Sequence, residues 1–319
     1  MVLIHNKLLT IIFHSLFYVI NLSSYLILIK YLENTYIYNN FWFNTLLSIL
    51  LSPIYLGYFL LKDVRTRLKN YGNALLFPCL AGIVYTAESI LLYYSINNVS
   101  LSYYTILRSS FVIWNIPFFI FFLGKKISKI YYIGCVLLLF SYSFIMYYYL
   151  RLNIDLLKPS MSIFISCLLN SVYNVVIEYS VKKYSILNVD FQIIFQLTYF
   201  SLALIPSLKQ TIDYPPPLNF NIVIVSIIIS ICLQFYLYNK IIILHHENDL
   251  VPSNVLMAGL DIIRRIVLLL FSFAMFKEDI NGYIIGSIFC FLFSGGCMFL
   301  EYFKPFKKNL KYNEMMEII

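Results

Sequence analysis

Charged side chains are scarce in this chain. Asp, Glu, Lys and Arg make up 12% of its 319 residues, whereas 61% of the residues are hydrophobic and the mean hydropathy is +0.80. An ordinary soluble domain has about 25% charged and about 45–50% apolar residues. The composition therefore excludes a chain built mainly of water-soluble domains and predicts a protein that lies in a lipid bilayer.

Cysteine patterns that would point to metal or redox chemistry are also missing. All six cysteines fall in apolar stretches and none forms a C-x-x-C pair, so neither a disulfide framework nor a zinc site is expected. No nucleophile–base or metal-ligand constellation stands out, which argues against an intramembrane enzyme. The sequence thus predicts no metal, no cofactor and no catalytic residue.

Long apolar runs fill most of the chain. A helix needs about 20 predominantly apolar residues to cross the hydrocarbon of a bilayer. Ten such segments can be placed, at residues 8–29, 41–61, 73–96, 101–123, 129–150, 160–181, 190–208, 221–244, 252–276 and 280–302. The first run reads as a true span and not as a signal peptide. The expected fold class is an all-α integral membrane protein with ten transmembrane helices.

Basic residues are distributed unevenly between the expected loops. With a cytosolic N-terminus and ten alternating spans, fifteen Lys and Arg residues fall on the cytosolic side and five, Lys30 among them, on the other side. This bias follows the positive-inside rule, so both termini are expected in the cytosol. The net charge of +8 then reflects topology and contact with anionic membrane lipid. No nucleic-acid partner is expected.

Two stretches of the chain resemble each other. FFLGKKISKIYYIGCVLLLFS covers the end of the fourth span and the fifth, AMFKEDINGYIIGSIFCFLFS covers the end of the ninth and the tenth, and Ile127 matches Ile280. We therefore expect two five-helix repeats, residues 1–155 and residues 156–319, the second ending in a short basic cytosolic tail. Because five is odd, the second repeat is inverted in the membrane, as is typical of secondary transporters.

Five ionisable side chains fall well inside the expected spans: Glu88, Arg108, Asp261, Arg264 and Arg265. A charge at the centre of a spanning helix costs about 2.5–3.5 kcal/mol. In a structural interpretation, Glu88 pairs with Arg108, and Asp261 pairs with a neighbouring arginine along its own helix. In a functional interpretation, three cations against two carboxylates leave one positive charge for a bound anion, and arginine binds phosphate in bidentate fashion.

The repeat relates these charges to one another. Shifted by the repeat offset, position 108 falls on position 261, so Arg264 and Arg265 lie about one turn further along the equivalent helix. Inverted repeats place their substrate near the membrane midplane, where equivalent helices meet. We therefore expect the three arginines to share one anion site.

Polar residues near Arg108 are further candidates for that site. Tyr104, Arg108 and Asn115 recur at helical spacing, and Ser109 lies beside them. Pro117 removes one backbone hydrogen bond, so we expect a bend in the fourth span below the site.

The same segments resemble a known family. The FLGKKIS after the fourth span and the FKEDI after the ninth resemble the drug/metabolite transporter superfamily, and VSLSYYTILRSS resembles its triose-phosphate translocator and nucleotide-sugar transporter branch. The longer stretch FPCLAGIVYTAESILLYYSINNVSLSYYTILRSS is most similar to Golgi-type members related to GDP-fucose transporters. The sixth span, NSVYNVVIEYS, departs from these relatives, which usually have an arginine and a tryptophan there.

The resemblance implies specific roles. In the plastid members a lysine on the fourth helix and a Lys-Arg pair on the ninth hold the substrate phosphate, and those roles fall here on Arg108, Arg264 and Arg265. The implied activity is exchange of an organic phosphate against a counter-substrate across a Golgi or ER membrane. A nucleotide sugar is the first choice of substrate, and a phosphorylated three-carbon or sugar metabolite is the second.

Two other functional classes stay open. A carrier for amino acids or drug-like cations would share the superfamily fold and would depend on Glu88 and Asp261. A non-transporting membrane receptor would use the charges only as structural pairs. Membrane lipid and a second copy of the chain, in a homodimer, are the remaining partners considered.

Overall fold

The computed structural model describes residues 2–36, 45–46, 52–123, 129–184, 186, 188–215, 225–226, 228–230, 232–233, 253–277 and 280–297. These residues are almost entirely helical and include no strand. Six helical segments among them are long and apolar enough to cross a membrane, so the chain fits a multi-pass membrane protein. Part of the second expected span and most of the eighth lie outside the described residues, and the count of ten stays a prediction.

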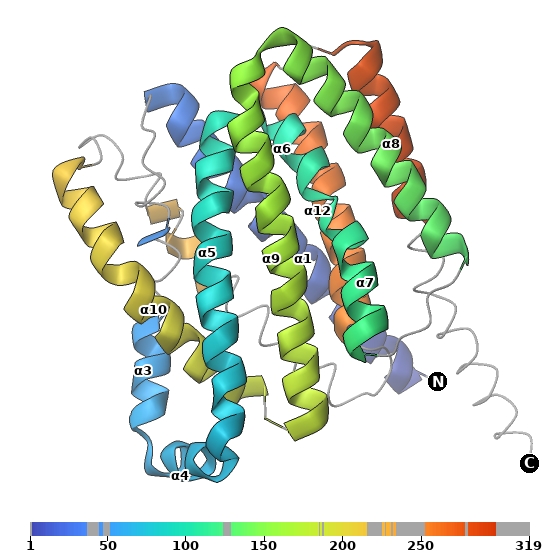
Figure 1. Cartoon of the computed structure of the whole chain (residues 1–319). Helices are drawn as coiled ribbons and strands as arrows, with labels where there is room; N and C mark the ends of the chain where they lie inside the picture. The colour runs from blue at the N-terminus through green and yellow to red at the C-terminus, as the bar shows by residue number, and fades with distance from the viewer. Residues whose placement is uncertain are drawn as a thin grey trace, which may run out of the picture. The chain divides into compact units, whose positions relative to one another are not determined.

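Figure 1 shows the helices, with the labels used below. They are α1 (Val2–Tyr36), α3 (Ser52–Leu60), α4 (Lys62–Tyr71), α5 (Leu76–Asn98), α6 (Leu101–Arg108), α7 (Phe111–Leu123), α8 (Lys129–Leu152), α9 (Leu157–Tyr184), α10 (Asn188–Asp213) and α12 (Ser253–Phe276), with short 3₁₀ turns at Gly72–Leu75 and Ile154–Leu156. A further apolar helix spans Gly282–Cys297.

The chain folds into two compact units that do not coincide with its two halves. One unit combines Met1–Ile27, Ile127–Tyr148 and Ile229–Ile319, and the other combines Leu28–Lys126 and Tyr149–Ile228. Each unit therefore draws helices from both expected repeats. The first is called here the α8 unit and the second the α9 unit.

Within the α9 unit, α9 packs along α5, and α10 packs on another side of α5 (Figure 1). Aromatic side chains fill these contacts, since Tyr85 of α5 lies 5.4 Å from Tyr173 of α9 and 5.2 Å from Phe195 of α10 between ring centroids. Gly82 lets α5 and α10 approach closely, because a Cβ at this position would lie 2.7 Å from the Cβ of Thr198.

The polar helix α4 lies between α3 and α5 and is tied to α10. Its Val64 and Leu68 are buried one turn apart, whereas its basic residues are exposed. Arg67 donates two hydrogen bonds to the carboxylate of Asp190, at 3.1 and 3.2 Å. Asp190 is completely buried and also accepts from the Tyr71 hydroxyl at 3.2 Å. This two-pronged pair fixes the start of α10 against α4.

Within the α8 unit, α8 and the helix Gly282–Cys297 pack through small residues. The hydroxyls of Ser141 and Ser287 each donate to the other's backbone carbonyl at 2.7 Å, and Ser294 donates to the carbonyl of Gly134 at 2.6 Å. Contact positions rise along one helix as they fall along the other, so the two helices are antiparallel. Small side chains at each contact let the backbones come close.

Lys30 differs from its expected position in a loop. Helix α1 continues past it to Tyr36, and Lys30 is buried, with its Nζ donating to the carbonyl of Ile96 at 3.0 Å. Ile96 lies in the last turn of α5, where backbone carbonyls lack partners within the helix. The ammonium group therefore satisfies a helix end inside the protein, which explains why a lysine can be buried there.

Candidate functional site

The expected fourth span is broken next to Arg108. Helix α6 ends at Arg108, Ser109 and Ser110 form a turn, and α7 starts at Phe111. The turn is held by bonds between residues three apart, including Ser110 N to Leu107 O at 3.0 Å and Ile113 N to Ser110 O at 2.9 Å. The bend expected at Pro117 is not the interruption, because α7 runs through Pro117 to Leu123. A change of hydrogen-bond pattern within a span is a frequent mark of a functional site.

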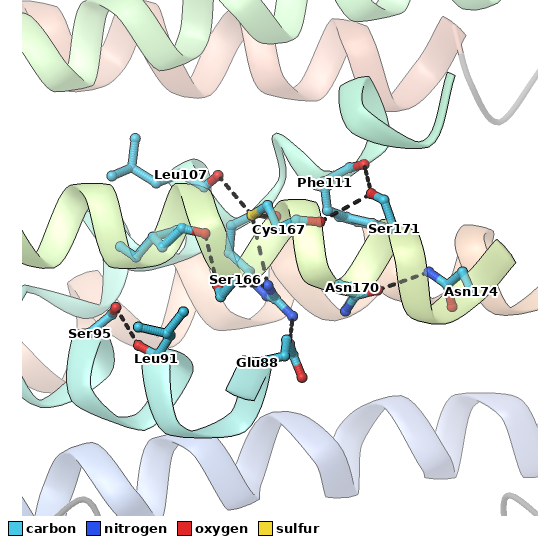
Figure 2. Close-up of polar contacts among 12 residues, drawn as sticks. Glu88, Leu91, Ser95, Leu107, Phe111, Ser166, Cys167, Asn170, Ser171 and Asn174 are labelled. Carbon is cyan, nitrogen blue, oxygen red and sulfur yellow. Dashed lines mark hydrogen bonds and ion pairs between the residues drawn. The ribbon is translucent and has the colours of Figure 1, made fainter. Parts of the chain in front are cut away.

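Side chains of α9 donate to backbone carbonyls on both sides of this break. The Cys167 thiol donates to the carbonyl of Arg108 at 3.4 Å, and the Ser171 hydroxyl donates to the carbonyl of Phe111 at 3.2 Å. Figure 2 shows Cys167 and Ser171 on α9 facing Leu107 and Phe111. Because buried backbone groups need partners, α9 stabilises the break.

Arg108 itself is buried and has partners on two neighbouring helices. Its Nη2 donates to a carboxylate oxygen of Glu88 on α5, in an ion pair. Its Nη1 donates to the Ser166 hydroxyl at 2.9 Å and to the Cys167 sulfur at 3.8 Å. All four side chains are buried, so α5, α6 and α9 meet around one guanidinium group.

This ion pair is the one that the structural interpretation of the charges predicts. It also shows what the site can do chemically, because Glu88 presents to Arg108 the kind of oxygen anion that a phosphate would present. Removing one partner from a buried pair leaves an uncompensated charge, at a cost of about 3–5 kcal/mol. An entering anion that displaced Glu88 would avoid that cost for Arg108.

The other residues expected near Arg108 are buried as well. Tyr104 lies one turn earlier on α6, and the Ser109 hydroxyl donates back to the carbonyl of Thr105 in α6 at 2.8 Å. Farther along, the Ser110 hydroxyl and the Asn115 side-chain oxygen are buried without a hydrogen-bond partner in the described part of the chain. Such atoms are rare in folded proteins and are satisfied by water or by a ligand.

The expected second half of the anion site lies on α12, in the α8 unit. Arg265 is buried and Arg264 is half-buried. Asp261 lies on the same helix, and its side chain is outside the described residues. Since Arg108 belongs to the α9 unit, the meeting of the three arginines stays a prediction.

Three residues at this site were not predicted: Ser166, Cys167 and Ser171, all on α9. They are separated from Arg108 by about 60 residues, so no local pattern connects them. One signal was present in the sequence, because small polar residues recur four residues apart in the sixth span. That spacing places them on one face of a helix.

No protein-family model and no curated protein matches this chain. The resemblance to the drug/metabolite transporter superfamily therefore rests on the quoted motifs and stays a prediction. The functional argument below depends on the residues around Arg108.

Proposed function

We propose that this protein is a secondary transporter that exchanges organic phosphates across a Golgi or ER membrane by alternating access. A nucleotide sugar is the first choice of substrate, and a phosphorylated three-carbon or sugar metabolite is the second. The observation that carries the proposal is the buried Arg108 at a break within a span, contacted by side chains of α5 and α9. Intramembrane charges at broken helices are typical of substrate sites in transporters.

Glu88 has a defined part in this mechanism. In the structure its carboxylate is ion-paired with Arg108. We expect a substrate phosphate to compete with this carboxylate for the guanidinium group. Arginine favours phosphate because its planar fork can donate two parallel hydrogen bonds. The unpartnered oxygens of Ser110 and Asn115 add polar groups further along the same segment of the chain.

The proposal includes ten spans in two inverted repeats, with Arg264 and Arg265 completing the phosphate site. The helix pair in the α8 unit supports the repeat. The repeat alignment matches Gly134 to Gly286 and Ser141 to Ser294, so the counterpart of the Ser294–Gly134 contact lies one residue from the Ser141–Ser287 contact. A pair of antiparallel helices with interchangeable contacts is what a two-fold axis in the membrane plane produces.

Counterflow measures this function directly. Proteoliposomes containing the full chain are preloaded with a nucleotide sugar, a nucleoside monophosphate, a triose phosphate or an amino acid, and uptake of the labelled compound is followed. We expect exchange of at least one phosphate compound, its loss in Arg108→Leu, and its retention in Arg151→Leu, which removes an exposed arginine at the end of α8. Exchange of the amino acid alone would contradict the proposal.

The non-transporting alternative receives some support from the Glu88–Arg108 pair, because a purely structural pair would look the same. A double variant, Glu88→Leu with Arg108→Leu, separates the two. Replacing a buried ion pair by apolar residues is often neutral or stabilising, so the variant is expected to fold and to lose phosphate exchange. A folded double variant with unchanged phosphate exchange would show that the pair is structural only.

A further inference from the structure

Helix α9 carries a row of polar residues that starts at the Arg108 contact. Ser166, Asn170, Asn174 and Glu178 follow one another at intervals of four residues. Each step of four turns by about 40° around the helix and advances by about 6 Å. The row, called here the α9 polar row, therefore forms a band that runs about 18 Å from Ser166 toward the Lys183 end of α9.

The polar row does not face lipid. The exposed apolar residues of α9 include Met161 and Ile165, with 47% and 43% of their surface accessible. At 100° per residue both project to the side of the helix opposite to the polar row. The row instead lies between two packed faces of α9, one where Tyr173 contacts Tyr85 of α5 and one where Ser171 contacts Phe111 of α7.

The two asparagines at the centre of the row are not fully used by the fold. Asn174 donates to the side-chain oxygen of Asn170 at 2.8 Å, as Figure 2 shows. Both side chains are half-buried, although they project away from the lipid-exposed face. Each amide can make four hydrogen bonds, and polar groups inside a membrane are costly when they lack partners.

From this arrangement we infer that Asn170 and Asn174 bind the hydrogen-bonding part of the substrate beyond its phosphate, and that this part is a nucleoside. The inference rests on the proposed function, because Ser166, the first member of the row, contacts the arginine that would hold the phosphate. Neutral amides present donors and acceptors together, which matches the edge of a nucleobase. A three-carbon phosphate is too short to reach along such a row.

A competition assay distinguishes the phosphate part of the site from the nucleoside part, because unlabelled compounds are tested as inhibitors of substrate exchange. Inorganic phosphate, glycerol 3-phosphate and the four nucleoside monophosphates are added to proteoliposomes with wild-type protein or with Asn170→Leu or Asn174→Leu. We expect at least one nucleotide to compete better than inorganic phosphate in the wild type. Each leucine variant should weaken competition by that nucleotide about tenfold, because one or two hydrogen bonds are lost. Competition by inorganic phosphate should stay unchanged.

Two controls keep the outcome interpretable. Asn98→Leu makes the same substitution at the exposed end of α5 and should leave nucleotide competition unchanged. Asn174→Gln keeps an amide at this position. If the leucine variants unfold at a lower temperature, partial recovery of nucleotide competition in Asn174→Gln separates loss of binding from loss of stability. An unchanged nucleotide preference in both leucine variants, or an equal loss for nucleotide and inorganic phosphate, would overturn the inference and leave the Arg108 site standing. Absence of competition by every phosphate compound in the wild type would instead refute the proposed function, and this inference with it.

Discussion

Arg108 and Glu88 show how single residues keep a charge inside an apolar chain. The guanidinium group is surrounded by a carboxylate, a hydroxyl and a thiol from two other helices. The sequence was sufficient to predict the ion pair as one interpretation, since it places two opposite charges on neighbouring spans. It could not predict Ser166 or Cys167, because nothing local connects α9 to α6.

Neutralising Glu88 is expected to change both stability and anion binding. Glu88→Gln leaves Arg108 buried without its ion-pair partner, so the unliganded protein should lose stability, by up to about 3–5 kcal/mol. An added anion can then take the place of the carboxylate. We expect inorganic phosphate to raise the thermal unfolding temperature of Glu88→Gln more than that of the wild type, measured in detergent at constant ionic strength.

The control for this prediction is Asp213→Asn, which neutralises an exposed carboxylate at the end of α10. It should respond to phosphate as the wild type does. An equal phosphate response in Glu88→Gln and the wild type would mean that phosphate does not reach Arg108.

At the scale of helices, most described elements match the expected spans, and the differences have tertiary causes. The apolar runs predict α5, α8, α9 and α10 because length and hydropathy are properties of a single segment. The break after Arg108 was missed because Ser109 and Ser110 are compatible with a continuous helix, and the contacts from α9 that accompany the interruption are not visible in the local sequence. Helix α7 runs through Pro117, so the interruption is not at the proline, and the bend expected there stays a prediction.

Removing the support from α9 should destabilise the break. Ser171→Ala takes away the donor to the Phe111 carbonyl, and a hydrogen bond of this kind contributes about 0.5–1.5 kcal/mol to stability. We expect a lower unfolding temperature and faster amide hydrogen exchange around Ser110. Ser162→Ala, which removes only a bond to the carbonyl of Lys158 in the same helix, is the matched control. Equal effects of the two substitutions would show that the contact between α9 and α7 does not hold the break.

The close approach of α5 and α10 gives a second prediction at this scale. Gly82→Ala would place a methyl group against Thr198 and the carbonyl of Phe195, and overpacking of this kind costs about 1–3 kcal/mol. Gly57→Ala on α3 meets no atom within 4 Å and should not destabilise, because alanine favours a helix. Thermal unfolding of the two variants measures the difference, and a Gly82→Ala protein as stable as Gly57→Ala would contradict the packing of α5 on α10.

At the scale of the molecule, the two compact units do not follow the two repeats that the sequence predicts. The expected halves, residues 1–155 and 156–319, describe an order along the chain, whereas each compact unit mixes segments of both. The antiparallel contact between α8 and Gly282–Cys297 joins segments of the two expected halves within one unit, and the two-fold symmetry stays a prediction.

The topology gives the last prediction. Helix α10 separates Lys183 from Tyr214, and both residues are exposed. Its segment Asp190–Asp213 is long and apolar enough to cross the bilayer, so the two positions should lie on opposite sides of the membrane. With ten spans and a cytosolic N-terminus, Lys183 falls on the cytosolic side, in agreement with the bias of basic residues.

Single cysteines in a background without the six native ones make this measurable. In sealed, right-side-out Golgi or ER vesicles, a membrane-impermeant maleimide should label Lys183→Cys without detergent and Tyr214→Cys only after detergent opens the vesicles. Labelling of both positions before detergent would mean that α10 does not cross the membrane. The reverse labelling pattern would mean that α10 crosses the membrane but that the chain has the opposite orientation. The basic loops would then lie on the lumenal side, against the positive-inside bias that sets the orientation of the proposed carrier.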